Sequence, residues 1–148
     1  MKQRFSVVLI GFLTLCASVL AEESCCQAGS NDAFVFDELL SQVKAMDKAT
    51  TELALNQRTT AEEGVRFMAW SKERDRNADQ LADTMSCHFL QHRIQAANPH
   101  YADLLRAAHA VMVDAAKIKA SVDIQQVQIL KEDLEIFQKL YQTYPEVE

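Results

Sequence analysis

Glycine and proline are almost absent from this chain after residue 21, and that constrains its fold more than any other feature. Only Gly29, Gly64, Pro99 and Pro145 occur there. Because tight turns between strands depend on these residues, the sequence does not favour a sheet. Between the few breaks, apolar residues recur at alternating spacings of three and four, which is typical of amphipathic helices. We therefore predict an all-α chain.

Four helices follow from this periodicity and from its caps and breaks. Asn31 or Asp32 would cap the first helix, and Asn98-Pro99 would end the second. Because short connections between long helices make neighbours antiparallel, we predict an up-down-up-down four-helix bundle. The helices are expected over residues 34–57, 60–97 and 101–119, and from Ser121 or Asp123 onward.

Each predicted helix has one apolar stripe that should face the core. In the second helix the stripe begins at Val65 and at Met68 or Ala69, and the mixed-sign run Ser71–Arg76 should be solvated. The other predicted core positions are Phe36, Leu39, Val43, Met46, Thr50, Leu53, Ala78, Leu81, Met85, His88, His92, Leu104, Leu105, Ala108, Val111, Met112, Ala115, Ile118, Val127, Leu130, Leu134, Phe137, Tyr141 and Tyr144.

The N-terminus has the pattern of a secretory signal peptide. Lys2 and Arg4 precede an apolar run that ends at Leu20-Ala21, and the run is too short for a comfortable membrane span. We predict a signal peptide over residues 1–21, a short polar metal-binding arm over 22–33 and the bundle domain over 34–148. The protein would then be exported to the periplasm or outside the cell, with no membrane attachment after cleavage.

The predicted mature chain is acidic. Cleavage removes two cations and no acid, which changes the formal net charge from −6 to −8. Such a surface argues against nucleic acid and anionic lipid as partners.

Helix order alone gathers the chemically interesting residues at one end of the bundle. The start of the first helix, the end of the second, the start of the third and the end of the fourth must all lie there. That end would hold Cys25, Cys26, Cys87, His88, His92, His100, Tyr101, Tyr141 and Tyr144, with His109 two turns away.

Thiol and imidazole groups at this end predict a metal site. His88 and His92 are four residues apart, so one helical face can present both rings to one ion, and Cys87 is adjacent. Such ligands suit zinc, copper or nickel. Two alternatives remain open: His88 could be a satisfied interior histidine, and Cys25 or Cys26 could form a disulfide with Cys87.

The segments Ser71–Leu81 and Ser86–Ile94, the link Lys119–Asp123 and the aromatic end Phe137–Tyr141 resemble the nickel-type superoxide dismutases. The resemblance implies a four-helix-bundle subunit, commonly a hexamer, that dismutates superoxide at one metal ion per subunit. In that family an N-terminal hook, His-Cys-x-x-Pro-Cys-Gly-x-Tyr, holds the metal.

This chain departs from the family at the hook, which reads Glu22-Glu23-Ser24-Cys25-Cys26-Gln27-Ala28-Gly29. The two thiolates carry over loosely to Cys25 and Cys26, and His88 stands where the family pattern has a tyrosine. Copper would fit such ligands at least as well as nickel. Tyr141 and His88 are candidates to relay protons, and Arg93 to steer the superoxide anion.

We therefore expect a superoxide dismutase-like metalloenzyme with Cys25, Cys26, Cys87, His88 and His92 as candidate ligands. The alternative is an exported bundle with a structural role, or one that binds copper or nickel without catalysis.

Overall fold

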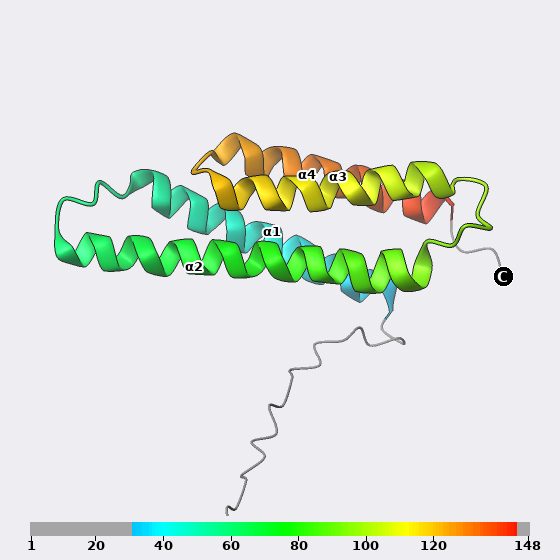
Figure 1. The fold of residues 1–148 in the computed structure, drawn as a ribbon, viewed down its shortest axis with the longest axis horizontal. Helices are drawn as coiled ribbons and strands as arrows, with labels where there is room; N and C mark the ends of the chain where they lie inside the picture. Colours follow the sequence, from blue (N-terminus) through cyan, green and yellow to red (C-terminus); the bar gives the residue numbers. More distant parts are fainter. Residues whose placement is uncertain (1–30, 145–148) are drawn as a thin grey trace, which may run out of the picture.

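A computed structural model of the chain describes residues 31–144, which form four antiparallel helices (Figure 1). No strand occurs in this range. The predicted all-α, up-down-up-down bundle is confirmed. The helices are α1 (Asp32–Leu55), α2 (Ala61–Thr84) with its π-helical continuation η1 (Met85–Arg93), α3 (Tyr101–Ala120) and α4 (Ile124–Thr143).

The first helix begins two residues earlier than predicted. Asn31 is its N-cap, and its side chain accepts a hydrogen bond from the backbone N–H of Ala33 at 3.0 Å. Asp32 is thereby in the first turn, where a carboxylate is favoured by the helix dipole. The predicted signal peptide and the rest of the predicted arm, up to residue 30, lie outside the described residues.

The second helix ends at Arg93 rather than at residue 97, and it ends as a π-helix. The backbone N–H of Ile94 donates to the carbonyl of Phe89 at 2.8 Å, five residues back. π-helical turns are rare and are often found at functional sites. No local sequence pattern predicted this one.

The core runs through the middle of the bundle and is most aromatic near η1. Phe36, Phe89, Phe137 and Tyr141 come from α1, η1 and α4, and their ring centroids lie 5.0 to 6.0 Å apart. Most predicted core positions are buried, including Leu39, Met46, Leu81, Leu104 and Leu134. Outside the beginning of α2, the exceptions are His92 and Leu105, which are exposed, and Met112 and Tyr144, which are partly buried.

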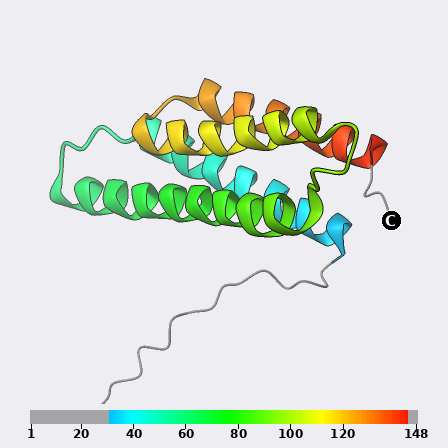
Figure 2. The ribbon, with the colours of Figure 1, turned by 45° about the vertical axis from the view of Figure 1, so that its right-hand side comes forward.

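The beginning of α2 is where the core prediction is wrong. Val65 is 70% exposed and Met68 59% exposed, and Ala69 is exposed as well. The α1–α2 hairpin extends past the ends of α3 and α4, so these helices do not cover it there (Figures 1 and 2). The apolar stripe continues along α2 beyond its packing partners.

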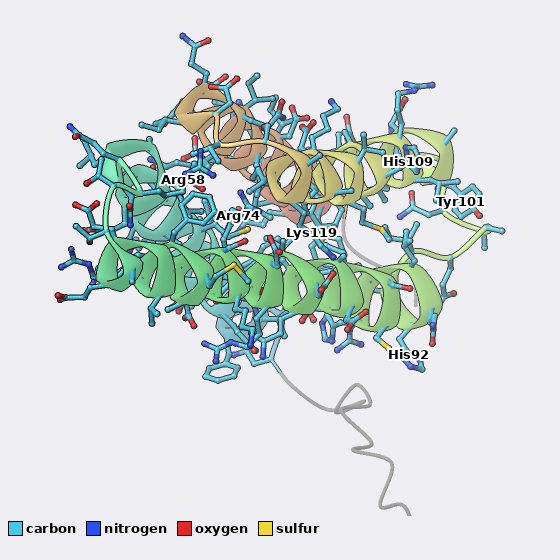
Figure 3. The ribbon with its side chains drawn as sticks, turned by 60° about the vertical axis from the view of Figure 1, so that its left-hand side comes forward. Arg58, Arg74, His92, Tyr101, His109 and Lys119 are labelled. Carbon is cyan, nitrogen blue, oxygen red and sulfur yellow. The ribbon has the colours of Figure 1, made fainter. Side chains whose placement is uncertain are left out.

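Arg74 contradicts the prediction that the Ser71–Arg76 run is solvated. Its side chain is buried and donates to the backbone carbonyls of Lys119 at 3.0 Å and Ser121 at 2.9 Å. Figure 3 shows Arg74 on α2 near Lys119, at the end of α3. Because the last carbonyls of a helix have no partner within the helix, this arginine caps α3 from outside.

None of the helices within residues 31–144 has the length and apolar character that crossing a bilayer requires.

Candidate functional site at one end of the bundle

The predicted meeting point of the four helices is present in the structure. The start of α1, the end of η1, the start of α3 and the end of α4 lie at one end of the bundle (Figures 1 and 2). We call this end the pole. It is also where the N-terminal segment that carries Cys25 and Cys26 joins the bundle, because Asp32 is the first residue of α1.

The carboxylate of Asp32 binds three side chains at the pole. Its Oδ1 lies 2.7 Å from Nε2 of His88 and accepts a hydrogen bond from Nε of Arg93 at 3.1 Å. Its Oδ2 accepts a hydrogen bond from the Tyr141 hydroxyl at 2.8 Å. These four residues, the Asp32 cluster, join α1, η1 and α4. All three residues predicted to take part in catalysis therefore contact one carboxylate.

One side of the Asp32 cluster is buried and the other faces solvent. His88 and Tyr141 are 5% and 7% exposed, whereas the side chains of Asp32 and Arg93 are 32% and 27% exposed. The His88 ring packs edge-on against Phe89, with ring centroids 4.9 Å apart. The cluster is thus fixed against the aromatic core while remaining accessible from outside.

Asp32 is ionised at neutral pH. Partial burial raises the pKa of this carboxyl, but the hydrogen bonds from Tyr141 and His88 and the charges of Arg93 and His88 outweigh burial. The net pKa lies below its ordinary value.

The other predicted ligands are more dispersed. Cys87 is a partly buried free cysteine, and His92 is exposed. Figure 3 shows His92 on the side of η1 that faces away from α3. Within residues 31–144, no three His, Cys, Asp or Glu side chains are grouped closely enough to hold a metal ion. The described bundle therefore does not fit a metal ion by itself, and Cys25 and Cys26 lie outside the described residues.

The family model of nickel-containing superoxide dismutase matches residues 25–144 of this chain. This range covers the described bundle and the two adjacent cysteines.

The chain belongs to the nickel-containing superoxide dismutase family.

No match was found among curated proteins or among solved structures. The family name gives superoxide as the substrate and nickel as the metal, and the comparisons give no support to copper. The predicted ligands Cys25, Cys26, Cys87, His88 and His92 stay predictions.

Asp32 is the residue that sequence reasoning missed in this nickel superoxide dismutase family member. The sequence indicates Asp32 only as an alternative cap for the first helix. An acid in a first helical turn is ordinary, so its identity carried no signal of a second role. Its position did: it directly follows the cysteine-bearing segment and lies at the end of the bundle where the other candidates gather.

Proposed function

We propose that this chain is an exported superoxide dismutase whose chemistry takes place at the pole. In the reaction, two superoxide ions and two protons give one oxygen molecule and one hydrogen peroxide. The observation that carries the proposal is the Asp32 cluster. It brings together an imidazole, a guanidinium and a phenol around the residue that follows the Cys25- and Cys26-bearing segment in the sequence, in a chain of this family.

Cys25 and Cys26 are the proposed thiolate ligands of one nickel ion per subunit. Five residues separate Cys26 from Asp32, and the six Cα–Cα steps between them span at most about 20 Å. Both thiols are therefore tethered within reach of the pole. Bound nickel would supply the one-electron chemistry, and Cys87 and His92 are reserve ligands on η1.

The bundle's own side chains would supply protons and a local positive charge. Peroxide requires two protons, and His88 and Tyr141 can hold and donate them. The acidic protein repels an anion such as superoxide, so a cation at the pole should raise the rate of encounter. Arg93 is the candidate, although its contact with Asp32 offsets part of its charge.

We also propose that the mature protein begins after Ala21 and assembles into a homo-oligomer, as the family resemblance implies. A hexamer is the first assembly to test for, by the mass of the purified mature protein in solution.

A second candidate function is a bundle that binds nickel without turnover. One observation favours it: the hook has neither the histidine nor the proline of the family pattern. The two candidates differ in catalysis, because a carrier would bind nickel reversibly and would not disproportionate superoxide.

The deciding experiment measures metal content and superoxide disproportionation on the same sample of mature protein. We expect one nickel per subunit, and we expect Cys25→Ser/Cys26→Ser to lose both nickel and activity. Cys87→Ser shows whether η1 contributes a ligand. His109→Gln is the matched control, because His109 is an exposed histidine on α3 outside the Asp32 cluster.

Each other outcome would support a different function or a different metal. Nickel-loaded protein without activity would support the carrier. Protein without metal or activity would leave a structural bundle, and stoichiometric copper would overturn nickel as the metal.

A further inference from the structure

The contacts of Asp32 determine which nitrogen of His88 carries a proton. An ionised carboxylate can only accept hydrogen bonds. Because Oδ1 of Asp32 lies 2.7 Å from Nε2 of His88, that nitrogen must be the donor. A neutral imidazole has one N–H and one bare nitrogen. In the neutral ring, Nδ1 is therefore bare.

The opposite arrangement, a protonated Asp32 donating to Nε2, conflicts with the rest of the cluster. Oδ1 also accepts from the Arg93 guanidinium, which can only donate. Oδ2 accepts from the Tyr141 hydroxyl. Both oxygens thus act as acceptors, as they do in an ionised carboxylate.

We propose that Asp32 is a positioning residue that holds the His88 ring in one orientation and in the Nε2–H tautomer, so that Nδ1 is the ring nitrogen through which His88 would act. The proposal rests on the dismutase function given above. There, one superoxide ion is oxidised to oxygen, and the second takes up the electron and two protons to become hydrogen peroxide.

The surroundings of His88 support a fixed ring. Phe89 packs against it edge-on, and Nε2 is bonded at 2.7 Å, so rotation of the ring would break both contacts. Arg93 and Tyr141 in turn hold the carboxylate from opposite oxygens. A carboxylate that orients a histidine through one ring nitrogen sets the tautomer and the basicity of the other.

The test is ¹⁵N spectroscopy of the mature, histidine-labelled protein, with the His88 signals assigned from His88→Gln. A bare ring nitrogen and a ring N–H have well separated ¹⁵N signals. At a pH where the ring is neutral, we expect a bare Nδ1 in the wild type and a change of tautomer population in Asp32→Ala. Tyr141→Phe removes a bond to Oδ2 but keeps the Oδ1–Nε2 contact, so its tautomer should stay that of the wild type.

Activity is measured on the same samples at matched metal content. We expect kcat/KM of Asp32→Ala to fall at least about tenfold, the scale on which loss of a carboxylate that orients a histidine lowers activity. Asp37→Ala removes an exposed carboxylate from the same helix and should keep the wild-type rate.

A wild-type His88 with its proton on Nδ1 would overturn the inference without any variant, even if Asp32→Ala does not fold. An altered tautomer with an unchanged rate would also overturn it. An inactive, metal-loaded wild type would overturn the proposed function as well, so the two failures are distinguishable.

Discussion

The pole and the opposite end of α3 and α4 both remove charged side chains from water, but they hold them differently. At the pole, side chains bind side chains: one carboxylate, Asp32, accepts from His88, Arg93 and Tyr141. At the other end, Arg74 binds backbone carbonyls of the α3–α4 connection. A side chain that binds backbone carbonyls, as Arg74 does, stabilises the fold. Side chains that share one acceptor, as at the pole, still have other polar atoms that can take part in a reaction.

The two ends also shift carboxyl pKa values in opposite directions. At the pole, three donors meet the carboxylate of Asp32, and the pKa of Asp32 is lowered. Near the other end, burial and the adjacent Asp114 carboxyl raise the pKa of Asp133. Lys117 and Gln126 donate to Asp114, at 2.7 and 3.2 Å. At Asp32 the hydrogen-bond donors and positive charges outweigh burial, whereas at Asp133 burial is the largest cause and the Asp114 carboxyl adds to it.

Replacing Arg74 should have the largest effect on stability. Arg74→Ala removes a buried donor group from two carbonyls of the connection, and we expect the free energy of unfolding to fall by about 2 kcal/mol. Chemical denaturation of the mature protein measures this. Superoxide disproportionation per bound metal should not change, because Arg74 does not contact the Asp32 cluster.

The matched control for Arg74 is Arg76→Ala. Arg76 is on the same helix but its side chain is 62% exposed and pairs with Glu73, so we expect a change within about 0.5 kcal/mol. Equal losses in the two variants would contradict the structural role assigned to Arg74.

Replacing Asp32 should cost less stability but more activity. Asp32→Ala leaves three donors at a partly exposed site, where water can replace the carboxylate, so we expect a loss of about 1 kcal/mol at neutral pH. Because its pKa is lowered, the folded protein gains stability from Asp32 above its ordinary pKa and loses it as the pH falls through the lowered value. The free energy of unfolding should therefore decrease less in Asp32→Ala than in the wild type as the pH falls. An equal decrease in both would contradict the assigned pKa direction.

The sequence predicted the helices well because their core positions depend on local periodicity. Leu39, Leu81, Leu104 and Leu134 follow from a 3.6-residue repeat without knowledge of neighbours. The prediction that Val65 is buried was wrong because its exposure depends on where the other helices end, and the periodicity of one helix carries no information about that. The prediction that Arg74 is solvated was wrong for a similar reason, because its acceptors lie 45 and 47 residues away in the chain.

The sequence predicted where the site lies but not the hydrogen bonds that connect its residues. Helix order placed His88, Arg93 and Tyr141 at one end, and they are indeed together. Asp32 joins them, at 56 to 109 residues away in sequence. No local sequence pattern predicts the π-helix η1 on which His88 and Arg93 lie. Long-range contacts of single polar side chains leave no periodic trace, so the central carboxylate was visible only in three dimensions.

The smallest predicted effect concerns the pair Asp114 and Asp133, where we expect a substitution to increase the stability of the fold. Above the raised pKa of Asp133, two like charges face each other between α3 and α4; as the pH falls through that pKa, Asp133 binds a proton and the repulsion ends. Asp133→Asn keeps a donor for Asp114 and removes the charge, so it should stabilise the protein at neutral pH by about 0.5 kcal/mol, the scale of a partly exposed charge pair. Denaturation at neutral and mildly acidic pH, with Glu135→Gln as the exposed control on the same helix, measures the gain in stability and its loss in acid. A destabilised Asp133→Asn at neutral pH would mean that Lys117 already neutralises the pair, and that the two ends of the bundle differ less than their pKa directions indicate.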